Sequence, residues 1–231
     1  MQQPTNIEIL FEDNHIIAVN KPAGKLSQGD ITGDDPIGDW VKQYIKVKYN
    51  KPGAVYLGLV HRLDRPTSGI LMFARTSKAL ERLNEMLKNK KIEKTYWAIV
   101  TKKPAQESGT LKHFLTRVEN KNITRATLKE TTGSKEAILE YKVLLNIDGY
   151  FLLEVKPKTG RQHQIRVQLA AIGCPIVGDL KYGYKEANED LSICLLAKRL
   201  HFEHPVKQEA ITIEAPLPKS GAWVRFNQKR K

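Results

Sequence analysis

The amino-acid sequence predicts an α+β fold, built on a mixed, largely antiparallel β-sheet with flanking helices. In most of its periodic segments apolar residues alternate with polar ones, as in strands, and turn-forming residues separate several of these segments. Helical spacing occurs in only three segments, which are inserted among the strands instead of following each strand in turn. That order favours α+β over a doubly wound α/β fold.

Composition fits one folded domain spanning residues 1–231. Hydrophobic residues make up 41% and charged residues 27% of the chain, close to the average of globular proteins, which excludes disorder, collagen-like repeats and low complexity. The scaling of surface with mass predicts that folding hides about 72% of the surface of the extended chain. We therefore expect a single domain whose core needs no disulfide or metal for stability.

The N-terminal segment predicts a β-hairpin followed by a helix. Apolar residues alternate through 7–11 and 15–19, on either side of the turn formers Glu12-Asp13-Asn14. Residues 36–49 carry Ile, Trp, Val and Tyr at helical spacing, and Lys51-Pro52-Gly53 is expected to follow the end of that helix. Because these elements begin at once, we expect no N-terminal accessory domain.

Two strands and a second helix are predicted next. The strands cover residues 55–60 and 70–74, and they flank a polar loop, residues 61–69, that contains Pro and Gly. Loops held by rigid strands commonly carry binding and catalytic residues. Thr76 or Ser77 can cap the following helix, whose apolar residues form a single stripe.

The rest of the chain predicts a long sheet with one short helix. Asn146-Ile147-Asp148-Gly149 is a hairpin turn signal between two strands. Residues 161–172 have apolar positions on one face and Gly173 as a C-cap, which predicts a short helix. The remaining strand patterns cover residues 94–100, 110–115, 137–145, 150–156, 193–202 and 210–213.

The charge of the chain points to a polyanionic partner. Lys and Arg outnumber Asp and Glu by 38 to 25, which gives a net charge of +13 and a pI near 9.6; a basic run, residues 228–231, ends the chain. No apolar run approaches the ~20 residues of a membrane span, and the N-terminus does not resemble a signal peptide. Cys174 and Cys194 match no disulfide or metal pattern, so we expect a reduced, cytoplasmic setting.

Three polar stretches contain candidate functional residues, and each also has a structural interpretation. Asp64, beside Arg62, fits a turn cap or surface ion pair as well as an ionised nucleophile. Tyr96 fits a sheet-face tyrosine as well as an aromatic platform for a flipped base. Arg166 fits a solvated helix face as well as a carboxylate clamp or phosphate contact. His163 has no suitably spaced partners, so no metal site is predicted.

In combination, these stretches resemble the motifs of the RluA-type RNA pseudouridine synthases. The loop around Asp64 resembles the signature motif of that family, and further motifs follow in the same order over residues 7–218. Each short motif is weak alone, but together they make the resemblance specific. The motifs are Lys21-Pro22-Ala23-Gly24, His61-Arg62-Leu63-Asp64 with Thr67-Ser68-Gly69 and Ala74, Lys94-Thr95-Tyr96-Trp97-Ala98, residues 160–166, and Pro175-Ile176-Val177-Gly178-Asp179 with Tyr182-Gly183.

The resemblance implies the pseudouridine synthase catalytic fold and the isomerisation of uridine in ribosomal or transfer RNA to pseudouridine, without a metal or cofactor. Asp64 is then the nucleophile, and attack on the sugar and attack on the base both stay open. Tyr96 would stack on the uracil and Ile165 would contact it, so that the detached base turns without escaping. Arg166 would pair with Asp64, and Arg62 would reach phosphate or fill the space of the extruded base. We expect no S4-like segment, so the chain would find its RNA through the catalytic domain. We also expect a monomer.

Two other classes of function compete with this interpretation. A non-catalytic RNA-binding module on the same fold fits the basic charge equally well, although binding alone does not require Asp64. A glycoside hydrolase would use Asp64 with a second acid such as Glu154 and would release free uracil. Gln168 and Leu196 depart from the family pattern, since histidine is common at both places, and we expect them to alter RNA contacts.

Overall fold

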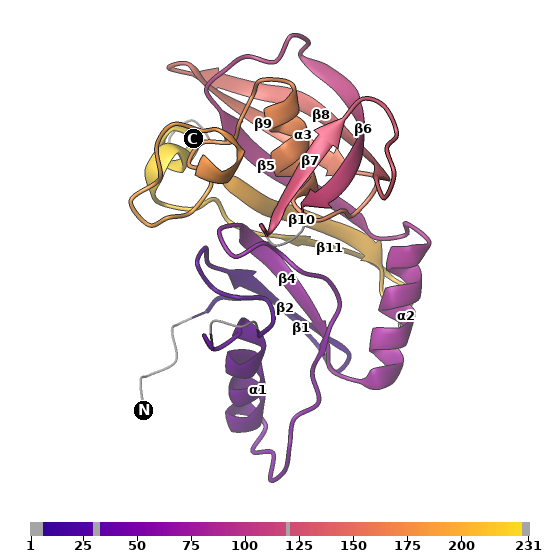
Figure 1. The fold of residues 1–231 in the computed structure, drawn as a ribbon. Coiled ribbons are helices and arrows are strands. Elements are labelled where there is room, and N and C mark those ends of the chain that lie inside the picture. The colour runs from indigo at the N-terminus through magenta and orange to yellow at the C-terminus, as the bar shows by residue number, and fades with distance from the viewer. Residues whose placement is uncertain (1–6, 30–32, 119–120, 228–231) are drawn as a thin grey trace. The chain divides into compact units, whose positions relative to one another are not determined.

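The computed structural model of the protein describes residues 7–29, 33–118 and 121–227 (Figure 1). These residues form two compact units. The first unit comprises the chain up to Glu93 and the segment Ala197–Pro216; the second comprises Lys94–Leu196 and the segment that starts at Leu217. The basic run at residues 228–231 lies outside the described residues. Within the described ranges, every helix is too short or too polar to cross a membrane.

The first unit is an antiparallel sheet with two helices. Its strand order is β1-β2-β4-β10, β3 pairs with β4, and β11 pairs with β10. Antiparallel register joins β1 to β2, β2 to β4, β3 to β4 and β10 to β11. The elements are β1 (Ile9–Glu12), β2 (Ile16–Lys21), α1 (Ile37–Lys48), β3 (Gly58–Leu59), β4 (Ser68–Ala74), α2 (Ser77–Lys88), β10 (Leu195–Glu203), which belongs to this unit from Ala197 on, and β11 (Ala210–Glu214).

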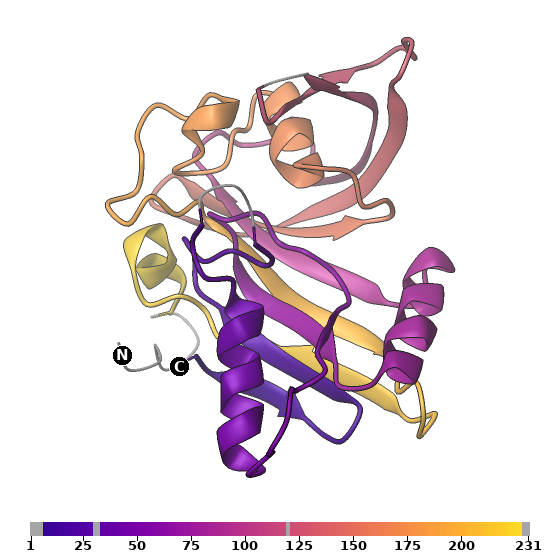
Figure 2. The ribbon, with the colours of Figure 1, turned by 60° about the horizontal axis from the view of Figure 1, so that its bottom comes forward.

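The core of the first unit lies between this sheet and α1. Figure 2 shows α1 running across the indigo and purple strands. The helix buries Ile37, Val41 and Ile45, which recur at helical spacing, and Gly38 lies against the ring of Phe73 on β4. Thr76 caps α2 by accepting a hydrogen bond of 3.1 Å from the backbone N–H of Ala79.

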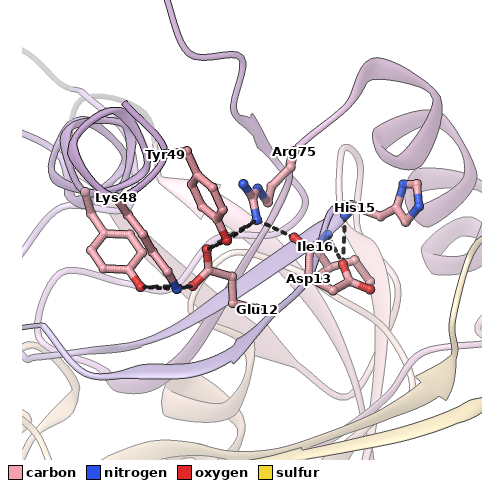
Figure 3. Close-up of polar contacts among 8 residues, drawn as sticks. Glu12, Asp13, His15, Ile16, Lys48, Tyr49 and Arg75 are labelled. Carbon is pink, nitrogen blue, oxygen red and sulfur yellow. Dashed lines mark hydrogen bonds and ion pairs between the residues drawn. The ribbon is translucent and has the colours of Figure 1, made fainter. Parts of the chain in front are cut away.

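A polar network centred on Glu12 fixes the end of the β1–β2 hairpin (Figure 3). Its carboxylate accepts hydrogen bonds from Lys48 at 2.6 Å, Tyr49 at 2.8 Å, Tyr44 at 2.9 Å and Arg75 at 3.2 Å. Burial raises the pKa of Glu12, but the hydrogen bonds from Lys48 and the two tyrosines outweigh it and hold the pKa below its ordinary value. The network therefore joins the C-terminal end of α1 and the segment after β4 to the hairpin.

The second unit is a five-stranded antiparallel sheet carrying α3. Its strand order is β5-β9-β8-β6-β7, and each neighbouring pair is antiparallel. The helix α3 packs on β6 and β7, and its Val167 meets Leu115 of β6 and Ala137 of β8 in a buried cluster. The elements are β5 (Glu93–Val100), β6 (Ser108–Val118), β7 (Ile123–Thr127), β8 (Lys135–Ile147), β9 (Tyr150–Pro157), α3 (Gln164–Ala171), the 3₁₀ turns η1 (Leu180–Tyr182) and η2 (Gly221–Trp223), and α4 (Val224–Asn227).

The predicted fold class is confirmed, as are the N-terminal hairpin, the first two helices and the Asp148-Gly149 turn. Asp148 and Gly149 both have positive φ, at 51° and 79°, which a two-residue hairpin turn requires. The strand predicted over residues 55–60 is wrong in most of its length, because only Gly58–Leu59 pairs, against the end of β4. The prediction also missed β7, an edge strand in which Thr124 alone is buried, so apolar alternation is absent.

The helix predicted over residues 161–172 begins only at Gln164. His163 adopts a left-handed conformation, with φ at 53°, which cannot continue a right-handed helix. Residues 161–163 therefore form a turn before α3. Gly173, with φ at 75°, follows the helix as predicted.

Candidate functional site

The loop that carries Asp64 is held to the turn after β2 by contacts on both sides of that residue. On one side, the Ser27 hydroxyl donates to the Leu63 carbonyl at 2.8 Å and accepts from the Leu63 N–H at 3.1 Å. On the other side, the Arg65 carbonyl accepts from the Gly24 N–H at 2.8 Å, and the Arg65 side chain donates to the Gly24 carbonyl at 2.9 Å. The backbone before and after Asp64 is thus fixed while its side chain stays half-buried.

The buried side chain of Lys21 also binds the backbone of this loop. The side chain of Lys21 has no exposed surface, and its ammonium donates to the carbonyls of Pro22, Lys25 and Arg65 at 3.0, 2.8 and 3.1 Å. These bonds use all three donors of the ammonium group. Burial lowers the pKa of Lys21 to about 7, and the negative charge of Asp64 opposes that shift. Lys21 and Asp64 are therefore close enough to interact electrostatically.

The two arginines beside Asp64 differ in their surroundings. Arg62 is exposed. Arg65 forms an exposed ion pair of 2.6 Å with Asp34, in addition to its bond to Gly24. Arg62 is therefore placed where a polyanion can reach it, whereas the side chain of Arg65 binds residues of its own chain.

The strand β5 presents Tyr96 as a half-buried side chain opposite Val155 on β9. Trp97, the next residue, is buried on the other face of the strand, since successive side chains alternate. Lys94 precedes Tyr96 by two residues and shares its face. The tyrosine is thus a sheet-face residue whose ring is partly accessible, which both interpretations of it allow.

The turn before α3 is locked by the side chain of Gln164. Its amide oxygen accepts from the Thr159 hydroxyl at 2.8 Å and from the Arg161 N–H at 3.0 Å, and its nitrogen donates to the Ile138 carbonyl on β8 at 3.0 Å. Ile165 and Arg166 follow directly and are both buried. Of the two interpretations of Arg166, the solvated helix face is therefore wrong.

Arg166 belongs to a buried polar cluster. Its guanidinium donates to both carboxylate oxygens of Asp179 at 2.7 Å and lies 5.0 Å from the centre of the Tyr182 ring. The Tyr182 oxygen accepts from the Thr124 N–H at 3.0 Å and lies 2.8 Å from Nδ1 of His163. The Tyr182 hydroxyl thus joins His163, in the turn before α3, to Thr124 on β7.

The residues predicted for the site are divided between the two units. Asp64 and Arg62 lie in the first unit, and Tyr96, Ile165 and Arg166 lie in the second. The predicted pairing of Arg166 with Asp64 stays a prediction. Sequence reasoning missed the structural partners Ser27 and Asp179, although Asp179 stands in a motif that the resemblance had marked.

Three further predicted residues are placed by the structure. Gln168 and Leu196 had been expected to alter RNA contacts. Both side chains are fully buried, so neither contacts RNA directly. Gln168 instead donates to the carbonyls of Leu111 and Ala137, which couples α3 to β6 and β8. Glu154, the second acid of the hydrolase alternative, forms an ion pair of 3.3 Å with Lys156. Among the described residues, no three His, Cys, Asp or Glu side chains are grouped to hold a metal ion.

Comparisons with known proteins place this arrangement among RNA-modifying enzymes. A family model described as RNA pseudouridylate synthase matches residues 15–171. A Bacillus subtilis protein named uncharacterized RNA pseudouridine synthase YlyB is 33% identical over all of this chain and 75% of its own length. The ribosomal large subunit pseudouridine synthase C of Rickettsia prowazekii is 35% identical, covering 91% of this chain and 68% of the relative.

Two further matches extend the comparison to a transfer RNA enzyme and to a solved fold. The tRNA pseudouridine synthase C of Vibrio parahaemolyticus is 33% identical over 93% of this chain and 92% of the relative. The solved structure of human RNA pseudouridylate synthase domain containing 4 matches with a TM-score of 0.76 at 23% identity, covering 92% of this chain and 89% of that one. The structural match supports the assignment of the fold, and the sequence matches establish the family.

Proposed function

The chain belongs to the RNA pseudouridylate synthase family, and on that premise we propose that the carboxylate of Asp64 is the nucleophile with which it isomerises uridine. The resemblance predicted from the motifs is confirmed: the protein is an RNA pseudouridine synthase, an isomerase that acts on uridines of ribosomal or transfer RNA. In the reaction the bond from N1 of uracil to C1′ of ribose breaks, and a bond from C5 to C1′ forms. The proton on C5 is lost and N1 gains one, so the product is an isomer of the substrate.

The observation that carries the proposal is the fixation of the loop on both sides of Asp64. A nucleophile gains most when its position is set before the substrate arrives, since little conformational freedom is then lost in the reaction. Ser27 fixes the residue before Asp64, and Lys21 and Gly24 fix the residue after it. The role requires a carboxylate that the nucleotide can reach, and the side chain of Asp64 is only half-buried.

The other site residues take roles suited to their surroundings. Tyr96 stacks on the uracil and Ile165 contacts it, which keeps the detached base in place while it turns. Arg166 orients Asp64, and its own orientation is set by Asp179. Arg62, which is exposed, contacts phosphate or fills the space of the extruded base.

We also propose that the protein works as a monomer in the cytoplasm and needs no metal or cofactor. Cys174 and Cys194 are buried free thiols, which suits a reducing compartment. The net charge of +13 supplies sequence-independent affinity for RNA.

The test compares Asp64→Asn with Asp39→Asn, which neutralises an exposed carboxylate on α1 that pairs with Lys42. Pseudouridine is mapped by carbodiimide modification across total RNA from cells that lack the gene and carry each variant. We expect Asp39→Asn to restore discrete positions in ribosomal or transfer RNA and Asp64→Asn to restore none. Filter binding of RNA should be nearly unchanged for both variants.

Activity of Asp64→Asn near that of the unmodified enzyme would exclude Asp64 as the nucleophile. Binding to RNA without modification of any position, even by the unmodified protein, would instead support the non-catalytic RNA-binding module. The positions that are restored identify the RNA substrate.

A further inference from the structure

Lys94 occupies an unusual place next to the predicted base platform. It lies on β5 two residues before Tyr96, so both side chains project from the same face of the sheet. Its ammonium nitrogen lies 3.8 Å from the point that a Cβ atom on Gly160 would occupy. Gly160 has no side chain and stands in the turn that leads into α3, where Ile165 and Arg166 follow. The cation thus lies between the strand of Tyr96 and this turn.

Lys94 is half-buried, yet none of the described carboxylates lies within ion-pair distance of its ammonium. Two exposed lysines of the same unit do form ion pairs: Lys112 with Glu136 at 2.6 Å, and Lys158 with Glu140 at 2.8 Å. Burial lowers the pKa of Lys94, because the charged ammonium is less well solvated there than in water. A cation kept in such a place without an anionic partner in its own chain is a candidate for binding an external anion.

We propose that the ammonium of Lys94 binds a phosphodiester oxygen of the RNA next to the uridine that stacks on Tyr96. The inference rests on the proposed function, because it takes Tyr96 as the base platform. Lysine suits this role as a compact point charge, and the missing side chain at Gly160 leaves room for the sugar-phosphate chain. A contact with a uracil carbonyl is the alternative, and salt dependence separates the two, since only a phosphate contact releases counterions.

The experiment measures RNA binding as a function of salt in four proteins that all carry Asp64→Ala, so that no turnover occurs. The probe is labelled large-subunit ribosomal RNA and, separately, bulk transfer RNA. Lys94→Met removes the charge and keeps the apolar stem, Lys94→Arg keeps the charge, and Lys112→Met is the control for loss of one positive charge from the same sheet. The fourth protein has no further change.

We expect Lys94→Met to weaken binding about 10-fold near 0.1 M salt and to make the slope of log affinity against log salt shallower by about 0.7–0.9. Lys94→Arg and Lys112→Met should stay within about 3-fold, with the slope unchanged. With Asp64 restored, Lys94→Met should raise KM and change kcat by less than about 3-fold.

Weaker binding by Lys94→Met with an unchanged salt slope would overturn the proposal in favour of a uracil contact. Unchanged affinity would overturn it in favour of a lysine that only covers the sheet. If thermal melting shows that Lys94→Met is unfolded, Lys94→Gln replaces it with the same expectations. An unmodified enzyme that forms no pseudouridine would refute the proposed function but would leave the binding results, and hence the phosphate contact, standing.

Discussion

The guanidinium of Arg166 donates to both carboxylate oxygens of Asp179 at 2.7 Å, and both side chains are buried. Two parallel N–H···O bonds fix the plane of the guanidinium as well as its position. The ring of Tyr182, 5.0 Å away, restricts the plane further. Asp179 therefore fixes the orientation of the Arg166 guanidinium.

Removing one partner of this pair should be costly, because the other charge is left buried. For Arg166→Met we expect the free energy of unfolding to fall by about 3–5 kcal/mol, measured by urea denaturation. Arg199→Met is the control: Arg199 pairs with Glu214 at 2.7 Å but is exposed, so the loss should be about 0–1 kcal/mol. Equal losses in the two variants would show that burial of the Asp179 pair does not decide its strength.

Tyr96→Phe should retain RNA binding, because it keeps the ring that we propose stacks on the base. Tyr96→Leu should weaken binding by about 1–3 kcal/mol, the usual worth of base–aromatic stacking. Filter binding and single-turnover formation of pseudouridine measure the two effects. Full activity in Tyr96→Phe would leave only the stacking role, and full binding in Tyr96→Leu would remove that role too.

Ser27→Ala removes two buried hydrogen bonds to the backbone of Leu63, directly before Asp64. We expect a loss of stability of about 1–3 kcal/mol and a lower kcat with little change in RNA affinity. Ser134→Ala, in an exposed turn where Ser134 bonds Thr131, should cost less and leave kcat unchanged. An unaltered kcat in Ser27→Ala would mean that catalysis does not depend on the hydrogen bonds between Ser27 and Leu63.

Gly69 combines a left-handed backbone with a close approach to β10. Its φ is 108°, and a Cβ atom there would lie 2.7 Å from the backbone nitrogen of Ala197. Gly69→Ala should therefore lower the free energy of unfolding by about 3 kcal/mol or more. Gly133 has φ at 76° with nothing within 4 Å of its Cβ position, so Gly133→Ala should lose only about 1 kcal/mol. Similar losses by calorimetry would contradict the steric explanation.

Lys21 should make stability depend on pH above neutrality. Burial lowers its pKa to about 7 in the folded protein, against 10.5 for an ordinary lysine, so between these values the unfolded chain binds more protons. The free energy of unfolding contributed by Lys21 should rise with pH across that window, by up to about 1.4 kcal/mol per unit. Urea denaturation of the unmodified protein and Lys21→Met from pH 7 to 10 measures this as a growing difference. A difference that stays constant with pH would contradict the prediction.

The sequence predicted the motifs better than the contacts between them. Asp64, Tyr96 and Arg166 were each found because their neighbours in sequence form short recognisable patterns. The partners of these residues lie far away along the chain: Lys21 meets the Arg65 carbonyl across 44 positions, and Arg166 meets Asp179 across 13. Periodicity reports which side of an element is apolar, and it carries no information on which polar groups meet when elements pack.

The errors in the predicted elements have the same origin. β7 has no apolar alternation, because as an edge strand it is defined by hydrogen bonds to β6 and not by burial. Residues 55–57 were predicted as strand because they are apolar or aromatic, but β4 is reached only from Gly58 on: Gly58 and Leu59 pair with it, and the Val60 N–H donates to the Met72 carbonyl. The left-handed His163 could not be foreseen, since its conformation accompanies a bond to Tyr182, 19 positions away.

The return of the chain to the first unit at Ala197 affects how the protein can be made. β4 obtains its neighbour β10 only after the intervening residues 75–196, which include nearly all of the second unit, have been synthesised. At about 5–20 residues per second, translation of that stretch takes about 6–24 seconds, during which β4 is paired with β2 and, at its end, with β3, but lacks β10. The nascent chain is thus exposed to aggregation and to chaperone capture for that interval, and a ribosome that stalls before codon 197 releases a product whose first sheet lacks β10 and β11.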